Sequence, residues 1–89
     1  MAVALSGDLG FASASALLEQ ARPQVASGQG TVELDLGAVK RVDSAGLALL
    51  LELAREARKA RREFKVTGAP EQLRRLADFF GVTPLLSLS

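Results

Sequence analysis

Apolar and polar residues alternate along short segments of the chain, and this period-two pattern predicts strands. The clearest segment is residues 31–36, TVELDL, where Val and Leu alternate with Thr, Glu and Asp. Residues 63–67, EFKVT, alternate in the same way, and residues 2–6, AVALS, form a short apolar run that stops at a Ser-Gly-Asp turn signal. We therefore expect three strands.

The segment between the first two expected strands, residues 9–27, has helical spacing. Its apolar positions are Leu17, Leu18, Ala21 and Val25, with Ser13 or Ser15 available as an early cap and Gly28 just past the end. Pro23 interrupts the pattern, so we expect either a kink there or a helix that ends near Ala21 and restarts.

Two more helices follow the second and third strands. Residues 45–62 begin almost wholly apolar and become amphipathic, which predicts a long helix buried first on most sides and later on one face. Residues 70–80 place Pro70 at a first helical position and Gly81 past the end. On this last helix the expected core face is Leu73, Leu76, Ala77 and Phe80, and Phe79 is either a rim residue or an exposed anchor.

Strands that alternate with helices predict an α/β layered fold, in which right-handed crossovers make neighbouring strands parallel. At 89 residues the chain has room for one core only, so we expect a single domain over residues 1–89. A hydrophobic fraction of 48% with 4% aromatic residues predicts a globular core of Leu, Val and Ala.

The charge composition excludes some classes of partner. Eleven basic and ten acidic residues give a net charge of +1, too little to attract nucleic acid or an anionic bilayer. One basic cluster lacks interleaved aromatic residues, so we interpret it as a solvated helix face; it contains Arg55, Arg58, Lys59, Arg61, Arg62 and Lys65. No signal peptide or membrane span is evident, and we expect a cytoplasmic protein.

The amino acids that are missing limit the chemistry. The chain contains no His, Cys, Trp or Tyr, which excludes serine-histidine and cysteine catalysis and the commonest zinc sites. It also has no glycine-rich loop with the Lys and Ser or Thr that hold a nucleotide. We expect no catalytic residue, no metal, no cofactor and no enzymatic activity.

The most informative motif is Asp43-Ser44-Ala45-Gly46-Leu47, which opens the apolar helix. A hydroxyl at a helix start can accept hydrogen bonds from the unpaired first-turn amides, so Ser44 is a natural cap, and a phosphate on it would be tolerated there. Gly46 permits the close approach of a neighbouring surface or simply closes the loop. In the simplest alternative, Asp43 and Ser44 only end a loop and cap a helix.

With these residues the segment 31–51 resembles the STAS family, the sulfate-transporter and anti-sigma-antagonist domains, in which a strand ending in Asp-Leu precedes an Asp-Ser-Ser-Gly-Leu type helix start. The resemblance continues through residues 65–86. It implies a small mixed or parallel sheet with helices packed across it. It also implies a partner-binding site at Ser44, Ala45, Gly46 and Leu47, phosphorylation of Ser44 in some members, and support from Asp35 and Asp43 at the same sheet edge.

Within the family, residues 41–59 are most similar to the STAS subunit of the Mla phospholipid-transport ABC complex. That similarity implies a non-enzymatic subunit that binds the cytoplasmic ATPase, supports its assembly and activity, and reaches the inner membrane only through the transporter. The alternative is an anti-sigma factor antagonist that binds an anti-sigma kinase and is released by phosphorylation at Ser44.

The sequence departs from the family in three places. Ala45 replaces the motif's second hydroxyl or glycine, which disfavours the antagonist, and Ala69 replaces a frequent helix-capping hydroxyl. The family's first strand is missing ahead of residues 2–6. We therefore expect either a reduced sheet or an edge covered by a partner or by a second copy in a homodimer.

Overall fold

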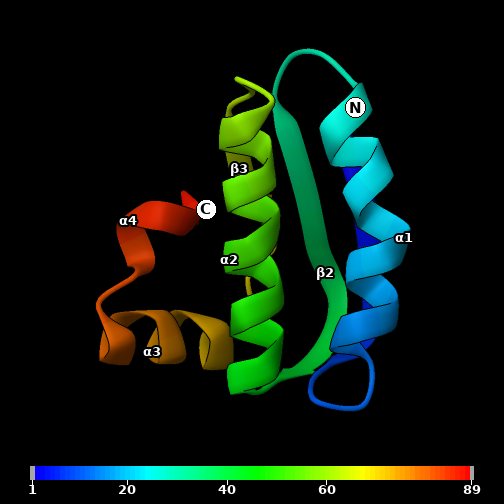
Figure 1. The fold of residues 1–89 in the computed structure, drawn as a ribbon. Coiled ribbons are helices and arrows are strands. Elements are labelled where there is room, and N and C mark those ends of the chain that lie inside the picture. The colour runs from blue at the N-terminus through cyan, green and yellow to red at the C-terminus, as the bar shows by residue number, and fades with distance from the viewer. Residues whose placement is uncertain (1, 89) are drawn as a thin grey trace.

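The computed structural model describes residues 2–88 and shows strands and helices in alternation (Figure 1). The elements are β1 (Ala2–Leu9), α1 (Ala14–Ser27), β2 (Val32–Val42), α2 (Ser44–Lys59), β3 (Phe64–Thr67), α3 (Glu71–Phe80) and α4 (Thr83–Leu86). The expected α/β class is confirmed. The short helix α4 was not expected from the sequence.

The three strands form one parallel sheet in the order β1-β2-β3. β3 pairs only with the first part of β2, from Val32 to Asp35, whereas β1 pairs with β2 from Glu33 to its last residue, Val42. The β1–β2 register shifts twice, between Ala4 and Ser6 and between Gly7 and Asp8. β2 is thus longer than the expected strand 31–36, because β1 keeps pairing with the segment that sequence analysis assigned to a loop.

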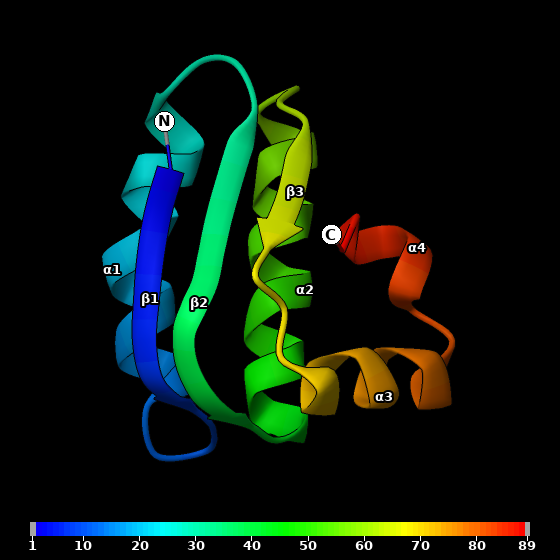
Figure 2. The same ribbon diagram turned by 180° about the vertical axis from the view of Figure 1, so that it is seen from behind.

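Helices α1 and α2 both cover one face of the sheet, and the other face is open (Figures 1 and 2). Along β2 the side chains of Val32, Leu34 and Leu36 are buried toward the helices, whereas Asp35 is exposed on the other side. The core therefore lies in one layer between the sheet and the two helices, as expected for strands whose residues alternate between apolar and polar.

Helix α1 continues without a break through Pro23, so the expectation of a helix that stops near Ala21 and restarts is wrong. Ala21 and Val25, on either side of the proline, are both buried in the core, while Pro23 itself is exposed. Core packing therefore holds both halves of the helix in one element despite the missing proline amide.

Helix α2 ends earlier than the expected residue 62. Arg61 adopts a left-handed φ of 58°, and the amide of Arg62 returns to the carbonyl of Ala57 at 2.8 Å. This turn directs Arg62 inward, where it is only 7% exposed. The interpretation of Arg62 as part of a solvated basic face is therefore wrong.

The buried guanidinium of Arg62 donates four hydrogen bonds to backbone carbonyls. Nη1 bonds to Gln24 at 2.9 Å and Val25 at 2.8 Å, in the last turns of α1, while Nε bonds to Gly30 at 2.9 Å and Nη2 to Gln29 at 3.2 Å. Carbonyls at a helix C-terminus carry partial negative charge. Arg62 thus fastens the end of α1 and the loop after it to the end of α2.

Helix α3 projects away from the two-layer body (Figure 2). Leu73 and Ala77 are buried as expected, and Gly81 ends the helix with a left-handed φ of 72°. Leu76 is half-buried, but Phe80 is 54% exposed and Phe79 is 82% exposed. The expectation of Phe80 as a core residue is therefore wrong, because the end of α3 extends past the body that covers its beginning.

Candidate functional site

The carboxyl ends of β1 and β2 meet at one edge of the sheet, where both α1 and α2 begin. The amide of Asp43, just after β2, donates to the carbonyl of Leu9 at the end of β1, at 3.1 Å. The loop after β1 is held by Ser13, whose hydroxyl accepts from the Gly10 amide at 3.1 Å and donates to the Asp8 carbonyl at 2.7 Å. In parallel α/β sheets this edge is where binding sites form.

Asp43, and not Ser44, caps helix α2. Its Oδ1 accepts from the amides of Ala45 at 2.9 Å and Gly46 at 3.1 Å, and its Oδ2 accepts from the amide of Phe11 at 3.1 Å. The bonds from Gly46 and then from Phe11 are the main reasons that the pKa of Asp43 lies below its ordinary value. The carboxylate therefore joins the loop after β1 to the start of α2.

Ser44 is the first residue of α2 and is exposed. The expectation that its side chain caps the helix is wrong, because Asp43 already occupies the amides of Ala45 and Gly46. A phosphate on Ser44 would not find these amides free, and it would lie beside the Asp43 carboxylate. The local tolerance for phosphate that the motif suggested is thus reduced by like-charge repulsion.

Gly46 and Leu47 are internal residues and do not form an outer surface. A Cβ on Gly46 would lie 2.1 Å from the carbonyl oxygen of Leu9, so the glycine lets α2 pack against the end of β1. Leu47 is 3% exposed within the core. Of the four residues expected to contact a partner, only exposed Ser44 and half-buried Ala45 remain accessible.

Asp35 does not join this site. It lies eight positions before Asp43 on β2, paired with Ala4 on one side and Thr67 on the other. Because five residue steps of β1, from Ala4 to Leu9, span the stretch from Asp35 to Val42, Asp35 lies roughly 17 Å from the end of β2 at about 3.3 Å per residue. The Oδ1 of Asp35 accepts from the amide of Gly37 at 2.9 Å, which is a local turn contact within β2.

An apolar groove lies directly beside Ser44, between the start of α2 and helix α3. It encloses about 900 Å³. Its lining residues are Val42, Asp43, Ser44, Glu71, Gln72, Arg75, Leu76, Phe79 and Phe80. The rings of Phe79 and Phe80 meet edge to face, with centroids 5.1 Å apart and an interplanar angle of 88°. We call this hollow the Ser44 groove.

Gln72 holds helix α3, which forms one side of the groove, against the end of β2. Its Oε1 accepts from the amide of Val42, the last residue of β2, at 2.9 Å. The buried side chains of Leu73 and Ala77 hold the rest of α3. The groove is therefore a preformed feature, with an ion pair of 3.5 Å between exposed Arg75 and Glu71 on its rim.

A smaller hollow of about 440 Å³ adjoins the groove on the side of β1 and shares Val42, Asp43 and Gln72 with it. Phe11 lines this hollow and is 89% exposed. Residues 2–88 contain four large exposed apolar residues. Three of them surround the junction of β2 and α2 at Asp43 and Ser44: Phe11, Phe79 and Phe80. Such clusters of apolar surface mark protein interaction sites more often than catalytic ones.

The described part of the chain has no group of three or more His, Cys, Asp or Glu residues placed to hold a metal ion. Among the helices of residues 2–88, none has the length and apolar content needed to cross a bilayer.

Comparison with known proteins identifies the family. A family model described as "Mlab, STAS domain" matches residues 1–87. The chain belongs to the STAS domain family. This STAS domain is 38% identical over 52 residues to the intermembrane phospholipid transport system binding protein MlaB of Haemophilus influenzae. The match covers 58% of the chain and 50% of that protein, so the chain spans about half the length of its curated relative.

Solved structures share the fold. The unphosphorylated anti-sigma factor antagonist SpoIIAA has a TM-score of 0.75 and 19% identity, covering 99% of this chain and 77% of that one. A putative anti-sigma factor antagonist from Thermotoga maritima has a TM-score of 0.83 and 16% identity, covering 98% and 77%. At these identities the likeness concerns the fold, and it confirms the expected STAS-like architecture.

Reasoning from the sequence singled out the Asp43-Ser44 segment of this STAS domain, considered Phe79 only as a rim residue or an isolated anchor, and did not connect Phe11 or Phe80 with that segment. Phe11 lies in a loop and Phe79 off the apolar stripe of its helix, and a single exposed aromatic residue carries no signal by itself. Their common feature, proximity to Ser44, exists only after β1, β2 and α3 are brought together at one edge.

Proposed function

We propose that this STAS domain is a non-enzymatic accessory subunit that docks onto the cytoplasmic ATPase of an ABC-type phospholipid transporter. The observation that carries the proposal is the Ser44 groove, a preformed apolar hollow with two exposed phenylalanines beside the family's motif. The similarity to MlaB, named for intermembrane phospholipid transport, supports this class of partner. In this role the domain supports assembly and activity of the ATPase and stays on the cytoplasmic side of the inner membrane.

The residues of the docking site are revised by the geometry. Ser44 and Ala45 remain as contacts at the start of α2, and Phe79 and Phe80 supply the aromatic anchors that dominate binding energy at many interfaces. Gly46 and Leu47 act from inside by fixing the α2 start against β1, and exposed Asp43 ties that start to the loop after β1. Asp35 has no role in the proposed contact.

The composition supports a docking function over catalysis. Without His or Cys the chain lacks the usual nucleophile-base pairs, and no glycine-rich nucleotide loop is present in its sequence. Four of the nine residues that line the groove are aliphatic or aromatic: Val42, Leu76, Phe79 and Phe80. The charged pair Glu71 and Arg75 lies exposed on the rim, and the Asp43 carboxylate is taken up by backbone amides.

The test is co-purification of the transporter ATPase with variants of this chain. Phe79→Ser removes an exposed aromatic residue from the groove, and Leu85→Ser removes an exposed leucine outside it, so the two changes are matched in kind. We expect Phe79→Ser to weaken binding tenfold or more, with unchanged thermal stability, and Leu85→Ser to bind like the wild type. Equal recovery of the ATPase by both variants contradicts the docking site.

A second candidate, an anti-sigma factor antagonist that is switched by phosphorylation, is favoured by one observation: Ser44 is exposed at the first position of its helix. The nearby Asp43 carboxylate and the change to Ala45 count against it. Mass spectrometry of the protein isolated from cells decides the point. A phosphate on the peptide that contains Ser44, together with a kinase in the same pull-down, would favour this candidate over the transporter subunit.

A further inference from the structure

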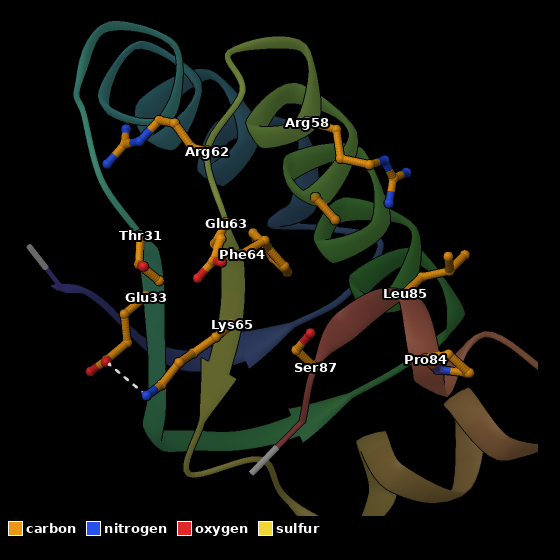
Figure 3. A pocket seen from close by; sticks show the side chains of 11 residues that line it. Thr31, Glu33, Arg58, Arg62, Glu63, Phe64, Lys65, Pro84, Leu85 and Ser87 are labelled. Atoms are coloured by element: carbon orange, nitrogen blue, oxygen red, sulfur yellow. Dashed lines mark ion pairs between the residues drawn. The ribbon is translucent and has the colours of Figure 1, made fainter.

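The two outer edges of the sheet are built differently. The edge of β3 is short, four residues, and carries Lys65, which forms an ion pair of 3.6 Å with Glu33. The Val66 amide donates to the Ser87 carbonyl at 3.3 Å. Val66 also forms an isolated parallel β-bridge with Leu88. Figure 3 shows Pro84, Leu85 and Ser87 lying across from Phe64 and Lys65. Short length, a lysine and a covering segment are the devices by which proteins protect sheet edges.

The edge of β1 has none of these devices. It is eight residues long and contains no Lys, Arg or Pro. Within residues 2–88 it has β2 on one side and no strand on the other, and Figure 2 shows it at the outside of the sheet. An edge of this length presents unpaired amides and carbonyls that can pair with another strand.

The surface beside this edge is uncharged. Between β1 and α1 lies a hollow of about 360 Å³, lined by Val3, Ala4, Leu5, Ser6, Leu17, Gln20, Ala21 and Gln24. These eight side chains are apolar or neutral, and Leu17 is only half-buried. A surface that will meet its own copy must not repel itself, and a surface for a charged partner needs complementary charge. On β1 itself the one charged residue is exposed Asp8, near the carboxyl end, where an antiparallel copy presents the apolar beginning of its own β1. The edge therefore places no like charges opposite one another and has no cluster of charge for a charged partner.

We propose that two copies of this chain pair through their β1 edges. The strands run antiparallel about a two-fold axis perpendicular to the sheet, so two three-stranded sheets join into one of six strands. This axis keeps the helices of both copies on the same side, and Leu17 of one α1 approaches Leu17 of the other. An antiparallel strand pair is self-complementary, because each copy supplies the donors and acceptors that the other requires.

The dimer leaves the Ser44 groove of each copy free. The groove lies between α2 and α3, and α3 projects from the β3 side of the sheet, away from β1 (Figure 2). The inference is therefore independent of the proposed docking function, and a failure of either can be recognised separately.

The first experiment measures the mass of the 89-residue chain in solution by light scattering and sedimentation, between about 1 μM and 1 mM. We expect a concentration-dependent rise from 9.4 kDa to twice that mass. Ala4→Lys adds a charge to the exposed face of β1, where it lies near its own copy in the dimer and should raise the dissociation constant tenfold or more. Ala38→Lys, on the exposed face of β2 opposite Ser6, is the matched control one strand away from the β1 edge and should dimerise like the wild type.

The second experiment uses the absence of cysteine in the chain. Ala4→Cys and Ser6→Cys, made separately, each place a single thiol on the open face of β1. In an antiparallel pair only the position at the two-fold axis meets its own copy, so mild oxidation should link the dimer for the variant that lies at the axis, and Ala38→Cys should remain monomeric. This assay still reads out pairing if Ala4→Lys fails to fold. The proposal is overturned if the chain stays at 9.4 kDa at every concentration, or if the variants at positions 4 and 38 behave alike in both assays.

Discussion

Replacing Arg62 should remove a large part of the stability of this small domain. The guanidinium is 7% exposed and donates to four carbonyls, and no carboxylate among residues 2–88 lies within ion-pair distance of it. A hydrogen bond contributes about 1 kcal/mol net, so Arg62→Ala should lower the free energy of unfolding by about 3–5 kcal/mol. A chain of this size has about 4–13 kcal/mol in total.

The measurement is urea unfolding followed by circular dichroism, together with thermal melts. For a domain of this size each kcal/mol corresponds to about 4–8 °C, so Arg62→Ala should melt at least about 12 °C below the wild type. Arg62→Lys keeps the charge but loses the planar fork, and we expect an intermediate loss of about 2 kcal/mol. Arg58→Ala is the control, because that arginine is exposed and should change stability by less than about 0.5 kcal/mol.

The reasoning would be refuted if Arg62→Ala lost less than about 1 kcal/mol, or no more than Arg58→Ala. In that case water would satisfy the four carbonyls as well as the guanidinium does, and the tie between the ends of α1 and α2 would be structural detail without energetic weight.

Further predictions concern glycines, acid stability and nucleotide binding. Gly46→Ala should destabilise by about 3 kcal/mol in urea unfolding, because its Cβ would overlap the Leu9 carbonyl. Gly28→Ala should destabilise the wild type but not Arg62→Ala, since its Cβ would lie 2.7 Å from Nη1; additive losses in a double-mutant cycle would contradict this. The lowered pKa of Asp43 means that its stabilising effect is present above its ordinary value of 3.8 and is lost as pH falls through the folded-state pKa. Melting temperatures measured down to about pH 2 should therefore fall more steeply for the wild type than for Asp43→Asn. Calorimetry with ATP should give no binding to the isolated chain; micromolar affinity would contradict the non-enzymatic assignment.

Much of the fold follows from the two periodicities of the sequence. The alternation of apolar and polar residues predicts the first half of β2 and all of β3. The helical spacing of apolar residues predicts α1, α2 and α3 to within a few residues. Gly81 ended α3 as expected because a left-handed residue there favours glycine.

The errors come from interactions between distant segments. The second half of β2, Gly37–Val42, has a loop-like sequence and is a strand only because β1 pairs with it. Asp and Ser have similar capping preference, so the sequence cannot decide between Asp43 and Ser44, whereas the contact with Phe11 does. Arg62 was assigned to solvent because its four acceptors lie more than thirty residues earlier in the chain.

Because β3 pairs with only the first part of β2, the backbone amides of this one strand should exchange with solvent at two different rates. On the β3 side, strand pairing ends at Asp35, and farther along a single side-chain amide, that of Gln72, takes the place of a neighbouring strand at Val42. In amide hydrogen exchange the start of β2 should therefore exchange only with global unfolding. Val42 should exchange whenever the beginning of α3 lifts by one turn. Exchange at this one amide thus reports how often the wall of the groove opens while the rest of the sheet stays folded.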